Sequence, residues 1–147
     1  MMQIFFTQEF IDEVTLISKS NSHNDCELSL IDNIFNKNID EIKNTGTKRL
    51  GGDPNKNPFL RKRIETSNSG KSSGYRLYLW IFYFENNVYL LFIHPKTGRR
   101  SGTNLTTEKQ KELVKTFKEN RDNNTFIKTE LSKQNKIVNS ASQEEIF

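Results

Sequence analysis

The sequence predicts an α+β fold built on a small antiparallel sheet with a basic face. Residues 75–85 are dense in aromatic and aliphatic side chains, a composition typical of a strand rather than a helix. Apolar residues recur three and four positions apart in two segments near the N-terminus, which predicts amphipathic helices. A third helical pattern, over residues 107–119, follows the strands.

The strongest strand signal in the sequence is a predicted hairpin at the centre of the chain. The strand over residues 75–85 is followed by Asn86-Asn87, and asparagine tolerates the positive φ that a two-residue turn requires. The return strand covers residues 88–94 and ends at Pro95, which has no amide to donate. Both faces of the first strand are largely apolar, which predicts a central strand. Arg76 is the exception, and it needs a carboxylate, an anionic ligand or a solvated edge.

A shorter strand is predicted before this hairpin, over residues 59–65. Its alternation points Arg61 and Arg63 to one side and the apolar residues to the other. Lys62 falls on the apolar side, which indicates an edge strand whose amine reaches water.

Strand pairing in chain order predicts a cluster of cations. If the strands are neighbours, Arg61, Arg63 and Arg76 line one side of a single sheet. His94 and Lys96 share a face by the same alternation. The sequence therefore places a set of basic side chains together on one surface.

The N-terminal part predicts a strand and two helices. Residues 1–6 are a short apolar run, and Thr7 is the expected N-cap of a helix that ends near Ser18. A second helix is predicted over residues 26–43 and is followed by a loop over residues 47–58.

The segments around the second loop and the C-terminus are polar. Residues 66–74 form a Ser/Gly/Asn loop in which Gly70-Lys71-Ser72 resembles a phosphate loop, but Glu65 stands where that motif requires a glycine. Residues 120–147 show little periodicity, so we expect a disordered tail or a weak helix that docks only with a partner.

Length and composition fit one domain in a reducing compartment. The chain has 147 residues and one cysteine, Cys26, which excludes a disulfide framework and favours the cytoplasm. Together with His23, Cys26 gives too few ligands for a metal site. The sequence contains no long apolar run, so we expect no transmembrane helix. Its N-terminal residues include no basic leader, so we expect no signal peptide.

Charge is distributed unevenly along the chain. The net charge is −6 over residues 1–42, +7 over residues 43–76 and +4 over residues 94–111. This polarity is typical of a basic patch that binds phosphates. It also fits an acidic N-terminal half that pairs with the basic half.

The order of elements and several motifs resemble a known family. The motifs are FLRKRIE, a Ser/Gly/Lys loop, GYRLYLW, VYLLFIHPK and a final helix opened by LTTEKQKELV. They resemble the RelE/ParE superfamily of toxins from bacterial type II toxin–antitoxin systems, most strongly its HigB-like branch. The match covers residues 59–117, whereas the N-terminal helices agree only in order and type. The extended tail is not part of the usual pattern.

The resemblance implies a fold, an activity and partners. It implies a compact toxin domain over residues 1–119, with a twisted antiparallel sheet packed against N-terminal helices and a C-terminal helix. It also implies metal-independent cleavage of mRNA, commonly on the ribosome, without a cofactor. The implied partners are a cognate antitoxin, mRNA and the ribosome, with no membrane.

The resemblance also assigns catalytic positions. Arg61 and Arg63 fall where basic residues help to activate the 2′-hydroxyl and hold the phosphate. Arg76 falls on the arginine of the GYR motif, and His94 or Lys96 on a basic group at the end of the last strand. A catalytic tyrosine is usual near the C-terminus. No tyrosine follows Tyr89, so this role is empty or taken by another group.

The chemistry of the residues agrees with these assignments. Arginine stabilises a phosphorane well but is a poor base because it stays protonated. Among these groups only His94 has an unperturbed pKa near neutrality, which makes it the acid/base candidate. The remaining RNA-binding candidates are nearby cations and one aromatic residue: Lys62, Lys71, Tyr78, Arg99 and Arg100.

Other readings of the same residues remain open. His94 can hold a structural hydrogen bond, Arg76 can form a structural salt bridge, and Arg61 and Arg63 can be solvated edge cations. Tyr78 can belong to the core or to an antitoxin interface. The alternative functions are a non-catalytic superfamily member that inhibits a protein target such as gyrase, as in the ParE branch, and a basic RNA-binding module.

Overall fold

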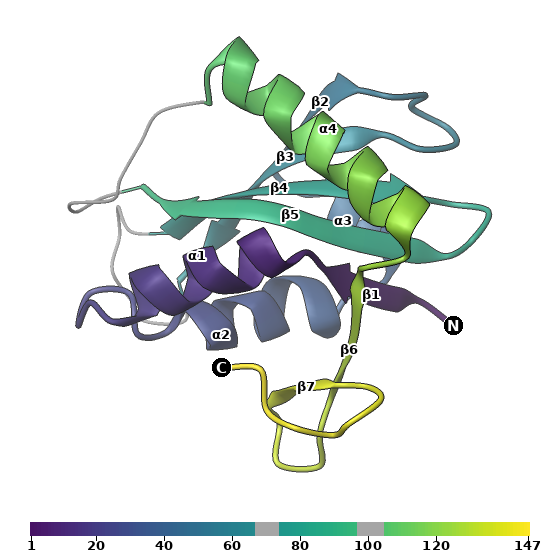
Figure 1. The fold of residues 1–147 in the computed structure, drawn as a ribbon. Coiled ribbons are helices and arrows are strands. Elements are labelled where there is room, and N and C mark those ends of the chain that lie inside the picture. The colour runs from purple at the N-terminus through teal and green to yellow at the C-terminus, as the bar shows by residue number, and fades with distance from the viewer. Residues whose placement is uncertain (67–73, 97–104) are drawn as a thin grey trace.

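The computed structural model describes residues 1–66, 74–96 and 105–147. These residues form an α+β fold with a seven-stranded mixed sheet in the order β2-β3-β4-β5-β1-β6-β7 (Figure 1). The strands are β1 (Gln3–Phe6), β2 (Thr47–Gly51), β3 (Phe59–Glu65), β4 (Gly74–Phe82), β5 (Asn87–Pro95), β6 (Ile127–Leu131) and β7 (Ile137–Asn139). The helices are α1 (Gln8–Ser18), α2 (Cys26–Leu30), the π-helix η1 (Ile31–Phe35), α3 (Ile39–Asn44) and α4 (Thr107–Asn123).

The central hairpin is confirmed. β4 and β5 pair antiparallel, and Asn86 in the turn adopts a φ of 56°. A β-bulge between Tyr78 and Leu79 shifts the register of the pair. β4 lies between β3 and β5, so the central position predicted from its two apolar faces is also confirmed.

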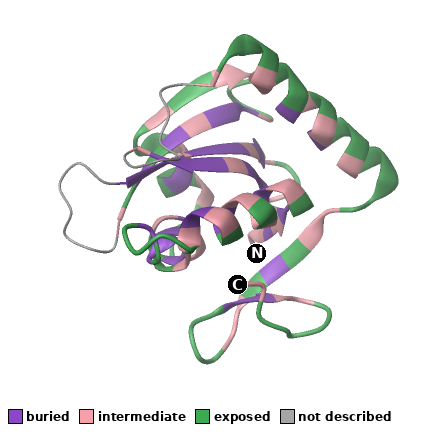
Figure 2. Ribbon diagram, turned by 60° about the vertical axis from the view of Figure 1, so that its left-hand side comes forward, coloured by how far each residue is buried: buried purple, intermediate pink, exposed green. Residues whose placement is uncertain are grey.

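Helices cover both faces of the sheet, and each face has its own apolar core. One core packs β4 residues such as Leu77 and Leu79 against α1, α2, η1 and α3. On the opposite face, α4 packs Leu113 and Phe117 against aromatic residues of the strands. Figure 1 shows α4 on one side of the sheet and α1 and α2 on the other, and Figure 2 shows that the central strands are largely buried. Alternation along β4 therefore separates two cores.

The sheet is mixed, which corrects the expectation of an antiparallel sheet. β1 runs parallel to β5, with Ile4 opposite Val88. A tight turn forces neighbouring strands to be antiparallel, but no such turn joins β1 to β5 because most of the fold lies between them in the chain. Sequence order alone therefore could not fix the direction of β1.

The helix predicted over residues 26–43 is interrupted. The chain forms α2 and η1 and then begins α3 at a new capping box, in which Asn38 Oδ1 accepts from the Glu41 amide and Glu41 accepts from the Asn38 amide. This reciprocal pair satisfies two amides at the start of a helix, so it favours a fresh start at Asn38. By contrast, α1 and its Thr7 N-cap are as predicted.

Residues 120–147 are ordered, which corrects the expectation of a disordered or partner-dependent tail. Helix α4 continues to Asn123 and ends at Asn124, which has a φ of 54°. β6 then pairs with β1, and β7 pairs with β6. Thr129 Oγ1 donates to the Ile4 carbonyl at 2.9 Å, and the Phe147 ring lies 6.0 Å from Phe6. The tail is thus part of the sheet and of the core.

Candidate functional site

Four cations surround a hollow at the edge of the sheet. Lys48, Arg61, Arg63 and Arg76 line a cavity of about 360 Å³ together with Gly46 and Thr47. They come from β2, β3 and β4, three neighbouring strands. We call the surface formed by these four cations the cationic face. His94 does not line the hollow; it lies buried on β5, next to Arg76.

The strand register explains why these side chains meet. Arg63 lies opposite Arg76, and Arg76 lies opposite His94, so the three residues form one row across β3, β4 and β5. Lys48 lies opposite Arg61 in the neighbouring row. Residues paired across strands share a face, and strands are separated by roughly 4.8 Å, so the row of three spans about 10 Å. The predicted sharing of one side by Arg61, Arg63 and Arg76 is confirmed.

His94 is the titratable group of this row. It is 6% exposed, and its Nδ1 lies 3.2 Å from the Pro95 carbonyl oxygen. A carbonyl only accepts, so this contact requires the proton on Nδ1 and leaves the lone pair on Nε2. Burial lowers the pKa of His94, the Pro95 hydrogen bond opposes this, and the charge of Arg76 lowers it further.

The unpartnered ring nitrogen of His94 can accept a proton only when a substrate group reaches it. Among the described residues, His94 Nε2 is buried without a hydrogen-bond partner. With its pKa below the usual value of 6.5, the imidazole is neutral at pH 7. A neutral histidine next to Arg76, with Arg63 one strand further along the row, combines a proton acceptor with anion stabilisers.

Several ion pairs of the described residues lie away from Lys48, Arg61 and Arg63. They join Lys109 to Glu9 and Glu112, Arg121 to Glu85, and Lys136 to Glu27. Within residues 1–66, 74–96 and 105–147, no carboxylate pairs with Lys48, Arg61 or Arg63. The acidic N-terminal half therefore leaves these three cations without an ion-pair partner.

Lys96 follows directly after the end of β5. Its amide donates to the Gly74 carbonyl at 3.0 Å, and its half-buried side chain lies beside Gly74. Because Lys96 lies outside the strand, its sharing of a face with His94 stays a prediction.

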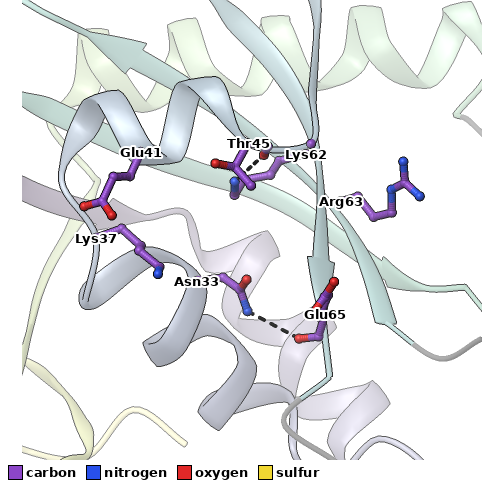
Figure 3. A pocket seen from close by; sticks show the side chains of 8 residues that line it. Asn33, Lys37, Glu41, Thr45, Lys62, Arg63 and Glu65 are labelled. Carbon is purple, nitrogen blue, oxygen red and sulfur yellow. Dashed lines mark hydrogen bonds between the residues drawn. The ribbon is translucent and has the colours of Figure 1, made fainter. Parts of the chain in front are cut away.

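Lys62 is not on this surface, which corrects its assignment as an RNA-binding edge residue. It is 2% exposed, and its Nζ donates to the carbonyls of Ile42 at 3.1 Å and Thr45 at 2.6 Å. Figure 3 shows Lys62 and Arg63 pointing to opposite sides of β3. β3 is an interior strand because residues 47–51, expected in a loop, form the edge strand β2. Burial, with a smaller contribution from Lys37, lowers the pKa of Lys62.

The ammonium of Lys62 acts as a cap for α3. Its two acceptors are carbonyls at the C-terminal end of that helix, where backbone oxygens lack intrahelical partners and carry partial negative charge. A separate cavity of about 360 Å³ opens beside it, between β3 and the helices, and includes Asn33, Lys37 and Glu41 (Figure 3).

Tyr78 is also removed from the RNA-binding candidates. Its side chain is fully buried in the core beneath α4, and its hydroxyl oxygen accepts from the Leu105 amide at 3.1 Å. A ring in this position cannot stack on a base, so the core reading of Tyr78 is the correct one. The candidates Lys71, Arg99 and Arg100 lie outside the described residues.

Sequence reasoning missed Lys48. It stands in Thr47–Gly51, a strand too short and too polar to be distinguished from the surrounding loop. The four residues between Gly46 and Gly51, Thr-Lys-Arg-Leu, do not alternate between polar and apolar, so they carry no strand signal. Pairing with β3 places Lys48 opposite Arg61, which makes Lys48 the fourth cation of the cationic face.

Neither a metal-ligand cluster nor a membrane-spanning helix occurs in the described residues. In residues 1–66, 74–96 and 105–147, no three His, Cys, Asp or Glu side chains are grouped so as to hold a metal ion. In the same residues, none of the helices combines the length and apolarity needed to cross a bilayer.

Comparisons with protein-family models, with curated proteins and with solved structures gave no match to this chain. The geometry and chemistry of the cationic face are therefore the basis for assigning a function.

Proposed function

We propose that the protein is an endoribonuclease that cleaves RNA at the cationic face. The observation that carries the proposal is the row of Arg63, Arg76 and His94 across three neighbouring strands. It combines two guanidinium groups with a buried, neutral imidazole. Cleavage through the 2′-hydroxyl needs a proton acceptor and positive charge around the phosphorus, and this row offers both.

Each residue has a role in the proposed reaction. His94 Nε2 takes the proton of the 2′-hydroxyl, whose oxygen forms a bond to phosphorus. Arg63 and Arg76 stabilise the charge that develops on the phosphoryl oxygens. The bond from phosphorus to the 5′-oxygen breaks, and Lys96 gives the leaving oxygen its proton. The products are a 2′,3′-cyclic phosphate and a free 5′-hydroxyl.

The biological setting in our proposal follows from the resemblance to the HigB-like toxins. The substrate is mRNA, cut on the ribosome, and the activity is restrained by a cognate antitoxin. Lys48 and Arg61 bind the phosphate next to the one that is cut. An antitoxin that covers the cationic face would supply carboxylates to these cations.

The test is induced expression in a bacterial host, with total RNA mapped for new 5′ ends. We expect growth arrest and cuts confined to translated messages. Arg76→Ala should abolish both while its melting curve matches that of the wild type. The matched control is Arg121→Ala, which also removes one arginine but from an exposed ion pair with Glu85. This control should remain toxic.

The other outcomes separate the competing functions. Growth arrest with intact RNA would move the assignment to a protein target such as gyrase. Tight RNA binding with neither arrest nor cuts would favour a plain RNA-binding module. Full toxicity of a well-expressed Arg76→Ala variant would remove Arg76 from the site.

A further inference from the structure

A second hollow lies on the same side of the sheet, between β2 and α4. Its volume is about 360 Å³. Strand residues Leu50, Phe59 and Trp80 form its floor, and its wall is formed by one side of α4, namely Thr107, Gln110, Lys111 and Val114. We call it the α4 hollow.

The α4 hollow continues the cationic face along the strands. Phe59 lies two residues from Arg61 on β3, so both side chains point to the same side of the sheet. The two positions are separated by about 7 Å at roughly 3.4 Å per residue. A polynucleotide with a phosphate at Arg61 can therefore reach the α4 hollow with an adjacent base.

The lining of the α4 hollow suits a flat, partly polar group. Trp80 stacks between Phe59 and Phe117, with ring centroids 5.0 and 4.6 Å away, so the apolar floor made by Leu50, Phe59 and Trp80 is held rigidly from behind by Phe117. At the wall, Gln110 Nε2 donates to the Leu105 carbonyl at 3.1 Å. Within the described residues the Gln110 side-chain oxygen accepts no hydrogen bond, which leaves an acceptor for an exocyclic amine.

The charges around the α4 hollow match a polyanion. Lys48 and Arg61 lie on the side of the cationic face. Lys111 lies at the wall, and Lys115 and Lys118 follow it on the exposed surface of α4, four and seven residues further along. Residues with this spacing lie on one side of a helix, so cations border the hollow on both sides.

We propose that the α4 hollow holds the nucleobase next to the scissile phosphate and thereby sets the base preference of cleavage. This inference rests on the proposed ribonuclease function. Its occupant is a base with an exocyclic amine, which donates to the Gln110 side-chain oxygen while its ring lies over the apolar floor.

Gly51 gives a way to fill the α4 hollow without disturbing the fold. Gly51 lines the α4 hollow and pairs with Phe59, next to a β-bulge between Arg49 and Gly51. A Cβ added at Gly51 meets no atom within 4 Å. The neighbouring Gly52 is different: it has a φ of +74°, and an added Cβ would lie 2.1 Å from the Asn57 carbonyl oxygen.

The first test compares cut sites in a translation lysate programmed with a defined set of messages. We expect the wild type to favour one amine-bearing base at one position beside the cut by about ten-fold, the lower end of what a single pocket provides. Gly51→Leu should still cut but lose that preference. Gly51→Ala, which adds one methyl group, is the matched control and should retain it.

A binding measurement makes the result independent of cleavage. Fluorescence anisotropy would compare a short single-stranded RNA with the same strand carrying one abasic nucleotide. The wild type should bind the abasic strand about ten-fold more weakly, in line with the loss of one base contact. Gly51→Leu should bind both strands alike. If Gly51→Leu is unfolded by its melting curve, Gln110→Leu replaces it and should lose the preference for an amine-bearing base.

The outcomes distinguish this inference from the proposed function. An unchanged base preference in folded Gly51→Leu, or equal binding of both strands by the wild type, would overturn the base site while leaving cleavage intact. A wild type that neither cuts nor binds RNA would overturn both.

Discussion

Replacing Lys62 by methionine separates a structural role of this residue from a role in binding RNA. The Lys62 ammonium is buried against the end of α3, where it donates to two backbone carbonyls. Lys62→Met keeps the aliphatic chain and removes only the charged donor. The expected effects are therefore a loss of stability and an unchanged affinity for RNA.

The magnitude follows from the two carbonyls that Lys62 holds. The Ile42 carbonyl is buried, and leaving such an acceptor without a partner costs about 1–3 kcal/mol. Thr45 is exposed, so water can replace the ammonium at its carbonyl. We expect the free energy of unfolding to fall by about 1–3 kcal/mol, which lowers the Tm by about 2–12 °C for a chain of this size.

Two measurements check this prediction, namely thermal unfolding and the salt dependence of RNA binding. Lys133→Met is the matched control, since it makes the same change at an exposed position between β6 and β7 and should leave both the Tm and the salt slope unchanged. Arg61→Met should show the opposite pattern, with an unchanged Tm and a salt slope reduced by about 0.7. A Lys62→Met variant that has the Tm of the wild type but a smaller salt dependence of RNA binding would refute the assignment of Lys62 to the α3 cap.

Two further predictions concern the histidine and the C-terminal strands. The cleavage rate should increase with pH as His94 loses its proton. Because the pKa of His94 is lowered, this rising limb of the pH–rate profile should lie below pH 6.5. His94→Gln should remove the limb and reduce the rate by about 10²–10⁴-fold, and a variant with an unchanged pH profile would exclude His94 as the base. Deleting residues 126–147 removes β6 and β7, uncovers β1 and should abolish cooperative thermal unfolding, whereas a wild-type Tm would show that these strands are dispensable.

The parts of the fold that the sequence predicted have strong local signals. The β4–β5 hairpin combines a dense aromatic run with an Asn-Asn turn, and α1 begins at a threonine cap. Local chemistry decides such elements, so they can be inferred without knowledge of their neighbours. Alternation then places Arg61, Arg63 and Arg76 on one side, which needs only the pairing of strands in order.

The missed parts depend on contacts between segments far apart in the chain. β2 is short and polar and becomes a strand by pairing with β3. β6 is stabilised by pairing with β1 more than 120 residues earlier, through contacts such as Thr129 with Ile4. The burial of Lys62 follows from β2, because an extra strand beyond β3 makes β3 interior. One undetected edge strand thus changed both the sheet and the list of candidate RNA ligands.

The end groups of the RNA fragments test the central claim most directly. A translation lysate supplied with wild-type protein should yield fragments that carry a 2′,3′-cyclic phosphate upstream of each cut and a 5′-hydroxyl downstream, because the 2′-oxygen is the nucleophile. The same lysate with Arg76→Ala should yield none. Intact messages in the presence of folded wild-type protein, or fragments with a 5′-phosphate, would contradict cleavage by the row of Arg63, Arg76 and His94.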